Sequence, residues 1–427
     1  MKLQTAKGVN DVPPEEKIIK NQLVDTLREV FELYGFAPLE TPIIERYETL
    51  TAKFAAGEAS DALKETFKLK DQGKRELGLR FDLTVPLARY VAMNPTMKMP
   101  FKRYEMGIVF RDGPIKAGRV RQFWQCDVDT IGTKSMLAEA EILAVVEMGF
   151  NKLKLDTEIR VNNRKLINGI LNQAGIMKNK EKEEAIIAID KLDKIGKVGV
   201  TKELQERGFK EQQVTELFKL IKKDISLAQL KTKLKDPEAL EGIKELEELF
   251  NYLRNMGVKT VVFDVSLARG LAYYTGTVYE AFMKNGKFTS SLAGGGRYDK
   301  MIGGFLGGNR EVPAIGVAFG LTPIMEVMKA REGTMKKNLA KVYVVPIKTV
   351  KESLQIVQQL RDKGIATDFD LNGRGISKNL QYVNSLGIPY AIMIGEKELE
   401  KGKVLLRNME TGDQELLSVK EVVKKLK

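Results

Sequence analysis

The sequence predicts an α+β fold built from more than one domain. Paired alternating segments with turn residues between them are typical of antiparallel hairpins, and a long charged stretch has helical periodicity. In the carboxy-terminal part, short strands alternate with helices, which indicates a separate α/β domain. At 427 residues the chain is longer than one hydrophobic core usually serves, so we expect two or three domains.

The first predicted elements are a helix and a strand near the amino terminus. Residues 15–34 place apolar side chains on one helical face and end before Gly35, a residue type favoured just after a helix. That apolar face consists of Ile19, Leu23, Leu27, Val30 and Tyr34. The following segment FAPLETPIIE, residues 36–45, predicts a strand.

Two antiparallel hairpins are predicted farther along the chain. The first joins FKRYEMGIVFRD (residues 101–112) to RQFWQCDVDT (residues 121–130), with turn-forming residues between them. The second lies in AFMKNGKFTSS (residues 281–291), where Asn285-Gly286 favours a two-residue primed turn. We therefore expect an antiparallel sheet with helices.

Composition changes divide the chain into parts. Residues 165–256 are charged, helically periodic and almost free of aromatic strand formers, so we expect a helical insertion between 1–164 and 257–335. From Lys341 the pattern alternates strands and helices up to a closing helix that begins at Ser418. Residues 341–427 are therefore expected to form a small α/β domain with a partly parallel sheet.

The composition excludes several kinds of chemistry. The chain has no histidine and a single cysteine, Cys126, which excludes internal disulfides, thiolate metal cages and an imidazole base. Any metal would be held by oxygen ligands, and proton transfer would fall to carboxylates, tyrosines or the substrate. A net charge of +13 favours polyanionic partners, although many basic proteins bind no nucleic acid.

Nothing in the sequence predicts export or a membrane span. There is no run of about 18 apolar residues, and the amino terminus MKLQTAKGVNDVPPEEK lacks the apolar core of a signal peptide. We expect a cytoplasmic protein.

The strand RQFWQCDVDT has two chemically different faces. Alternation places Trp124, Cys126 and Val128 toward a core. The opposite, mixed face carries Arg121, Phe123, Gln125, Asp127 and Asp129. Such a face is commonly open to solvent, but an aromatic ring between an amide and carboxylates is also able to stack a base and hold an amine.

Other residues suit an anion and a cation. Arg111 ends the partner strand of this hairpin, and its guanidinium suits either a phosphate or a surface ion pair. Asp82 and Thr84 either cap the helix that follows them or accept hydrogen bonds from an ammonium group. In RGLAYYTGTVYEAF, Arg269, Tyr273 and Tyr274 suit structural packing or a small ligand, and the glycines of LAGGGRYD allow close approach of a backbone.

Taken in order, these motifs resemble histidyl-tRNA synthetases in their archaeal and eukaryotic style. The resemblance rests on KGVNDVPP, GFAPLETPIIE, LRFDLTVPLARY, FRDGPIKAGRVRQFWQCDVD, SLARGLAYYTGTVYEA, LAGGGRYDKMIGG and VPAIGVAFGL. The segment from VVPI to YAIMIG resembles that family's anticodon-binding domain. The match covers nearly the whole chain.

The resemblance implies an antiparallel class II aminoacyl-tRNA synthetase sheet and a ligase of protein biosynthesis. Such an enzyme uses ATP and Mg²⁺ to make histidyl-adenylate, then transfers the histidyl group to tRNA(His). It implies that Arg111 and Arg269 bind the reacting carboxylate and α-phosphate, and that Phe123 stacks adenine. The residues implied at the ammonium group are Asp82, Thr84, Gln125 and Asp129, and those implied around the imidazole are Tyr273 and Tyr274. A homodimer is also implied, because GFAPLETPIIE resembles the class II interface motif.

Two positions depart from the family pattern. Ala272 replaces the usual aspartate before the twin tyrosines, and Thr322-Pro323 replaces an acidic residue and the arginine that normally faces the γ-phosphate. Arg310 is a candidate replacement for that arginine. These departures leave a second hypothesis open, a catalytically weakened paralogue that senses histidine or regulates through tRNA binding. A third is a basic nucleic-acid-binding protein, which leaves the predicted ammonium-binding carboxylates unexplained.

Overall fold

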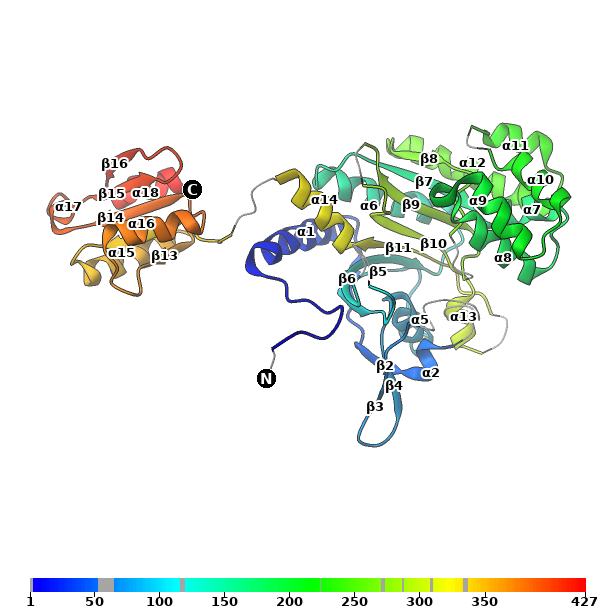
Figure 1. The fold of residues 1–427 in the computed structure, drawn as a ribbon, viewed down its shortest axis with the longest axis horizontal. Helices are drawn as coiled ribbons and strands as arrows, with labels where there is room; N and C mark the ends of the chain where they lie inside the picture. The colour runs from blue at the N-terminus through cyan, green and yellow to red at the C-terminus, as the bar shows by residue number, and fades with distance from the viewer. Residues whose placement is uncertain are drawn as a thin grey trace. The chain divides into compact units, whose positions relative to one another are not determined.

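The computed structural model describes residues 3–52, 65–115, 120–222, 224–269, 273–285, 288–307, 310–332 and 337–427 (Figure 1). The chain forms two compact units. One unit comprises Met1–Asp11 and Gln22–Met328, and the other comprises Val12–Asn21 and Lys329–Lys427.

The first unit is organised around an eight-stranded sheet with the order β1-β5-β6-β11-β10-β9-β7-β8. Its strands are β1 (Ala37–Pro38), β5 (Phe101–Phe110), β6 (Gln122–Ile131), β7 (Thr157–Asn163), β8 (Val261–Phe263), β9 (Thr277–Met283), β10 (Ala293–Arg297) and β11 (Ala314–Gly320). The edge pairs β1–β5 and β7–β8 are parallel, and all other neighbouring pairs are antiparallel. The α+β prediction is confirmed.

Helices α1 (Pro14–Leu33) and α6 (Met136–Lys152) contribute to the core on one face of this sheet (Figure 1). Phe319 of β11 packs against Phe31 of α1 and Phe150 of α6, at ring-centroid distances of 5.7 and 5.4 Å. Cys126 and Val128 are buried in the same core, as alternation along β6 predicted. Polar side chains of β6 are therefore left for the opposite face.

Both predicted hairpins are present. Phe101 pairs with Ile131 and Phe110 with Gln122, so β5 and β6 pair over their full lengths. In the second hairpin Ala281 pairs with Ala293, and the predicted turn at Asn285-Gly286 lies partly outside the described residues.

The predicted strand at 36–45 is instead two short strands, β1 and β2 (Ile44–Arg46). Strand β2 belongs to a small three-stranded sheet, β2-β4-β3, with β3 at Lys68–Lys70 and β4 at Glu76–Leu79. The short helices near it are α2 (Tyr47–Leu50), α5 (Thr84–Met93) and α13 (Met301–Phe305).

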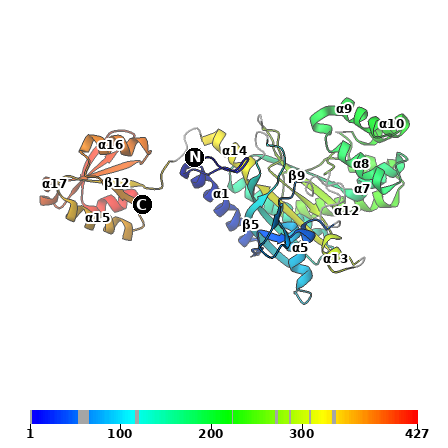
Figure 2. The ribbon, with the colours of Figure 1, turned by 60° about the horizontal axis from the view of Figure 1, so that its bottom comes forward.

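Six helices follow β7 without an intervening strand in the described residues, and Figure 2 shows them gathered in one group. They are α7 (Arg164–Gln173), α8 (Asn179–Ile189), α9 (Leu192–Glu206), α10 (Glu211–Leu220), α11 (Leu227–Lys233) and α12 (Pro237–Met256). The Asp236 side chain caps the start of helix α12. The helix ends just before Gly257, whose φ of 76° is favourable for glycine.

The carboxy-terminal part forms a five-stranded sheet, β13-β12-β14-β15-β16, whose first three strands are parallel. Its elements are β12 (Val342–Pro346), α15 (Val350–Asp362), β13 (Thr367–Phe369), α16 (Ile376–Ser385), β14 (Tyr390–Ile394), α17 (Glu396–Glu400), β15 (Val404–Asn408), β16 (Gln414–Leu417) and α18 (Val419–Leu426). Ser418 caps α18 as predicted, accepting a hydrogen bond from the backbone N of Glu421. The partly parallel α/β prediction is confirmed.

No helix among the described residues combines the length and the apolar character that crossing a bilayer requires.

Candidate active site

A buried ion-pair network underlies the polar face of β5 and β6. The hairpin register sets Arg103 opposite Asp129, and Glu105 opposite Asp127. The fully buried Arg103 guanidinium lies 2.9 Å from an Asp129 oxygen and donates to the Leu83 carbonyl at 3.1 Å. Sequence reasoning missed Arg103 and Glu105, although the predicted hairpin register combined with strand alternation would have placed both on this face.

Arg80 ties this network to the loop before β2. Its Nη1 donates to Glu105 at 2.7 Å and to the Thr41 carbonyl at 2.7 Å. Gly107 makes room for the guanidinium, because a Cβ there would lie 2.2 Å from Arg80 Nη2. Removing one partner from such a network would leave an unpaired buried charge. The network therefore holds the side chains beneath the polar face of β5 and β6 in fixed positions.

Asp82 lies on this face at the start of α5, where both of its predicted roles are possible. Its Oδ1 accepts a hydrogen bond from the Val85 backbone N at 3.0 Å, which is a capping contact. Burial raises the pKa of Asp82 to about 6, against the lowering effects of that hydrogen bond and of the Arg111 charge. Thr84 is the first residue of α5 and is partly buried.

Arg111 and Phe123 lie together at the end of the hairpin where β5 is joined to β6. The Arg111 guanidinium carbon is 5.0 Å from the centroid of the Phe123 ring, and its Nε donates to the Phe81 carbonyl at 3.1 Å. This arrangement holds a cation beside an aromatic face, which suits a phosphate next to a stacked base.

Gln125, Asp127 and Asp129 follow Phe123 along β6 and are all buried. Gln125 Oε1 and Asp127 Oδ1 have no hydrogen-bond partner within the described residues. Burial raises the pKa of Asp127 well above its ordinary value, and Asp129 and Asp82 raise it further. A cation placed here would relieve that cost.

Asp129 is more fully engaged than its neighbours. Its Oδ1 accepts a hydrogen bond from the Tyr298 hydroxyl at 2.5 Å, and its Oδ2 pairs with Arg103. Gly316 on β11 accommodates this carboxylate, because a Cβ there would lie 1.9 Å from Oδ1.

Arg269 lies beside strands β9 and β10, which β11 separates from β5 and β6 in the strand order. Its Nε is 3.6 Å from Glu280, its guanidinium carbon is 5.5 Å from the Tyr274 ring centroid, and its buried Nη1 has no hydrogen-bond partner among the described residues. A Cβ at Gly294 would lie 2.3 Å from that Nη1. The glycines of LAGGGRYD thus form a strand whose missing side chain leaves space for Arg269.

Tyr273 packs against two other tyrosines of the site. Its ring lies 4.6 Å from that of Tyr274 and 6.4 Å from that of Tyr298. Burial raises the pKa of Tyr273 well above its ordinary value, Asp82 raises it further, and the charge of Arg269 opposes the rise. Asp82 is thus close enough to Arg111 and to Tyr273 for their charges to interact, and Tyr273 is close enough to Arg269.

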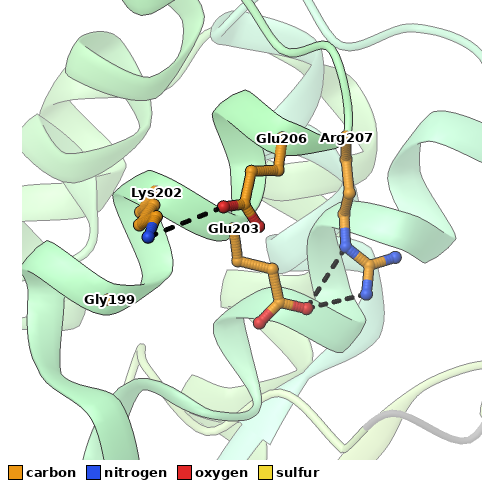
Figure 3. A pocket seen from close by; sticks show the side chains of 5 residues that line it. All are labelled: Gly199, Lys202, Glu203, Glu206 and Arg207. Atoms are coloured by element: carbon orange, nitrogen blue, oxygen red, sulfur yellow. Dashed lines mark hydrogen bonds and ion pairs between the residues drawn. The ribbon is translucent and has the colours of Figure 1, made fainter.

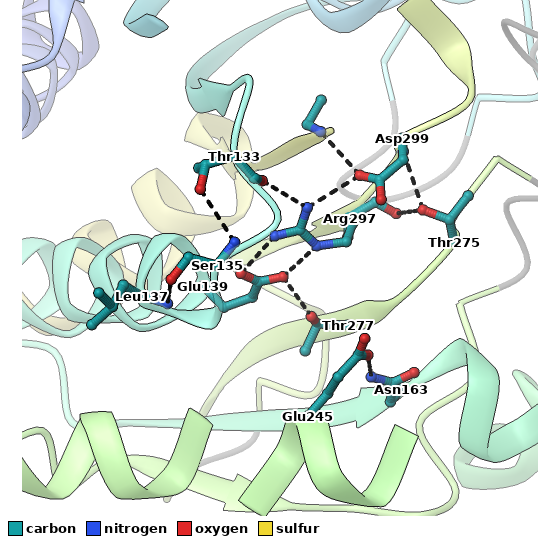
Figure 4. Close-up of polar contacts among 12 residues, drawn as sticks. Thr133, Ser135, Leu137, Glu139, Asn163, Glu245, Thr275, Thr277, Arg297 and Asp299 are labelled. Carbon is teal, nitrogen blue, oxygen red and sulfur yellow. Dashed lines mark hydrogen bonds and ion pairs between the residues drawn. The ribbon is translucent and has the colours of Figure 1, made fainter. Parts of the chain in front are cut away.

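A second buried network holds the end of β10 (Figure 4). The Arg297 guanidinium donates to both Glu139 carboxylate oxygens at 2.5 and 2.8 Å, and to the Thr133 carbonyl at 3.1 Å. Asp299, paired with the same guanidinium at 3.2 Å, accepts from the Ala314 backbone N. These contacts hold the strand that carries Gly294.

A hollow on α9 has no comparable features (Figure 3). Glu203 accepts from Arg207 at 2.7 Å, and Lys202 lies 3.8 Å from Glu206, so the charges around it are paired with one another.

Of the two positions that depart from the family pattern, the structure describes one. Ala272 lies outside the described residues. Thr322 and Pro323 are the second and third residues of helix α14 (Leu321–Glu332).

Comparisons with known proteins identify the family. A family profile described as histidyl-tRNA synthetase matches residues 8–324, and one described as an anticodon binding domain matches residues 341–427. The chain belongs to the histidyl-tRNA synthetase family. "Histidine--tRNA ligase 1" of Bacillus cereus is 42% identical over 97% of this chain and 95% of its own length. "Histidine--tRNA ligase" of Clostridium tetani is 36% identical over 98% and 97%.

Solved structures of histidyl-tRNA synthetases have the same architecture. The enzyme from Nostoc sp. PCC 7120 superposes with a TM-score of 0.87 at 32% identity, covering 100% of this chain and 99% of that one. A Bacillus halodurans structure titled "ATP phosphoribosyltransferase regulatory subunit/histidyl-tRNA synthetase" has a TM-score of 0.74 at 22% identity, covering 90% and 97%, and shows the shared fold alone. The class II catalytic sheet and the anticodon-binding-type domain of the synthetase family are therefore both present.

Proposed function

We propose that this chain activates histidine with ATP to histidyl-adenylate and transfers the histidyl group to tRNA(His), with the face formed by β5, β6 and β10 as its active site. Family membership across both profiles supports the reaction. The observation that carries the site is a group of buried polar atoms on this face that make no hydrogen bond within the described residues. It includes Gln125 Oε1, Asp127 Oδ1 and Arg269 Nη1, together with Arg103 Nε and Nη1 and Asp129 Oδ2. Acceptors on one side and a donor on the other match the ammonium and carboxylate ends of an amino acid.

In this proposal Arg111 and Arg269 bind the histidine carboxylate and the α-phosphate of ATP. Adenylation places negative charge on the phosphorus oxygens, and fixed guanidinium groups in a water-poor site stabilise that charge. No protein base is needed, which agrees with a chain that contains no histidine. Phe123, held beside Arg111, stacks adenine.

The amino-acid side of the proposed site is acidic and aromatic. Asp82, Thr84, Gln125 and Asp129 bind the ammonium group, and Asp129 is held in place by Arg103 and Tyr298. Tyr273 and Tyr274 surround the imidazole. Because an ammonium group stabilises ionised carboxylates, histidine binding offsets the cost of burying Asp82 and Asp127.

The remaining assignments rest on the family. Among the described residues no group of three or more acidic or cysteine side chains is arranged to hold a metal ion, so we assign no residue to Mg²⁺, which we expect to bind together with ATP. We propose domains at 1–164 with 257–335, a helical insertion at 165–256, and an anticodon-binding domain at 341–427. We also propose a homodimer and a cytoplasmic location. An archaeal or eukaryotic style is not part of the proposal, because the relatives and solved structures named above are bacterial.

Histidine-dependent ATP–pyrophosphate exchange tests the proposal. The wild-type chain is expected to catalyse exchange, and Arg269→Gln to lower kcat by at least about 100-fold because it removes a donor to the developing charge. Lys202→Gln, on the surface of α9, serves as the control and is expected to retain full activity.

The same assay separates the alternatives. Histidine binding without exchange would support the weakened paralogue that senses histidine. If the chain neither binds histidine nor catalyses exchange, the proposal is overturned, and a protein that only binds nucleic acid is favoured.

A further inference from the structure

A cavity of about 1000 Å³ lies between the catalytic sheet and helices α7, α8 and α12. Tyr273 and Tyr274 form part of its wall on the side of the candidate active site, and Arg164 and Lys182 form part of the helical wall. This cavity is separate from the Arg111 side of the site, since neither Arg111 nor Phe123 lines it.

Arg164 stands out among the lining residues. It is the first residue of α7 and only 8% exposed. Its backbone N donates to the Gly276 carbonyl at 2.7 Å, but its guanidinium makes no hydrogen bond or ion pair with any residue that the structure describes. Burial lowers the pKa of Arg164 to about 10, although Glu183 and Glu238 oppose the shift. No Arg164 side-chain nitrogen is among the fully buried atoms that lack a partner, so the guanidinium opens into the cavity, where a ligand can reach it.

Most acidic side chains of the cavity wall already form ion pairs or hydrogen bonds with other side chains of the protein. Lys165 pairs with Glu241 at 2.7 Å and with Glu245 at 2.6 Å, and Asn168 donates to Glu238 at 2.8 Å. Figure 4 shows Glu245 also accepting from Asn163.

The basic groups are less fully engaged. Arg297 and Lys134 pair with acidic neighbours, but Arg164, Lys182 and Lys300 have no ion pair within the described residues. Among the acidic lining residues, Glu183 and Glu238 likewise lack an ion pair within the described residues, although Glu238 accepts the hydrogen bond from Asn168. Basic and acidic side chains are equally numerous around the cavity, but the unpaired ones carry a net positive charge.

We propose that this cavity binds a phosphate group through Arg164, with Lys182 and Lys300 adding positive charge. The planar guanidinium donates two parallel hydrogen bonds to phosphate oxygens, and a dianion balances the additional lysines. The volume exceeds that of a phosphate ion, so the group belongs to a larger molecule. Its source is either the phosphodiester backbone of an RNA or a free phosphate compound such as a nucleotide.

The variant Arg164→Gln tests this inference in the full chain, independently of catalysis. Thermal unfolding is followed with and without sodium pyrophosphate, and the affinity for tRNA(His) is measured over a range of salt concentrations. Lys244→Gln, exposed on α12 and outside the cavity wall, is the matched control, and Arg164→Lys keeps the charge.

We expect two measurable effects of Arg164→Gln, one on unfolding without ligand and one on ligand binding. Without ligand, Arg164→Gln should unfold at the same or a higher temperature than the wild type, because the substitution removes no hydrogen bond or ion pair within the described residues. With ligand, it should bind at least about tenfold more weakly than the wild type and the Lys244→Gln control, with partial recovery in Arg164→Lys.

The two sources give different supporting results. Loss of the stabilisation by pyrophosphate indicates a free phosphate compound. Weaker tRNA binding with a shallower salt dependence, at unchanged pyrophosphate response, indicates a phosphodiester. Equal responses of Arg164→Gln and wild type to both ligands would overturn the inference. If Arg164→Gln does not fold, the double variant Lys182→Gln with Lys300→Gln must weaken the same response several-fold, or the inference fails.

Discussion

Asp82 links stability and substrate binding at the scale of a single residue. Its pKa of about 6 in the folded chain exceeds the unfolded value near 4, so the folded state holds the proton more tightly. The stabilisation from that proton is complete at low pH and is lost as pH rises through 6. The carboxylate that is proposed to bind ammonium is therefore unfavourable for folding at neutral pH.

We predict that Asp82→Asn raises stability at pH 7.5 by about 1–3 kcal/mol while weakening histidine binding. Asn still accepts the hydrogen bond from Val85 N, so the cap of α5 is kept. The KM for histidine should rise more steeply for the wild type than for the variant as pH falls below 6, because protonation of the substrate imidazole affects both proteins and protonation of Asp82 only the wild type. Chemical denaturation at two pH values and exchange kinetics check both parts; a variant less stable at pH 7.5 than the wild type would contradict this account.

Gly294 gives a second prediction at this scale. A methyl group at this position would displace the Arg269 guanidinium, so Gly294→Ala should lower kcat/KM for exchange by about 100-fold. Gly375→Ala is the matched control, because nothing lies within 4 Å of a Cβ there. Comparable losses in the two variants would show that Gly294 does not position Arg269.

Among individual residues, sequence reasoning worked where strand alternation decides the outcome. Phe123, Gln125 and Asp129 share the predicted face because side chains alternate along β6. The partners of Arg103 and the space left by Gly294 and Gly316 depend on contacts between strands distant in sequence. Those contacts follow from tertiary packing, so local patterns did not predict them.

At the scale of elements, boundaries set by caps and turns were predicted well. Ser418 caps the start of α18, and Gly35 follows the end of α1 with a φ of 74°. The segment at 36–45 was predicted as one strand, whereas β1 and β2 separate and join different sheets. Which sheet each joins depends on pairing with β5 and β4, which the segment itself does not encode.

The loop between β13 and α16 carries a prediction for the anticodon-binding domain. Asp370 accepts hydrogen bonds from Asn379 and from the Arg374 backbone N, at 3.0 and 2.5 Å, and the Arg374 guanidinium lies 4.4 Å from the Tyr382 ring centroid. A stacked cation on a surface tyrosine suits an unpaired RNA base.

We predict that Arg374→Ala raises the KM for tRNA(His) by about tenfold and leaves histidine-dependent exchange unchanged, because exchange needs no tRNA. Lys401→Ala, exposed after α17, is the control. Aminoacylation and exchange assays measure the two effects, and equal tRNA kinetics for the two variants would exclude this surface from tRNA binding.

For the whole molecule, the absence of histidine from 427 residues has a consequence for synthesis. The chain is made without consuming the product of its proposed reaction, so we predict that its synthesis continues during histidine starvation. A reporter fusion compared with a variant in which several exposed lysine codons are changed to histidine codons measures this. Equal yields during starvation would show that the composition has no such effect.

The central claim for the whole molecule is that Arg111 and Arg269 converge on one reacting group opposite Asp82. A crystal structure of the full chain with a stable analogue of histidyl-adenylate tests it most directly. We predict that both guanidinium groups lie within hydrogen-bonding distance of the linkage between the histidyl and adenosine parts, with the Asp82 carboxylate at the ammonium group. An analogue bound with only one of these arginines in contact, or with Asp82 turned away from it, would contradict the account.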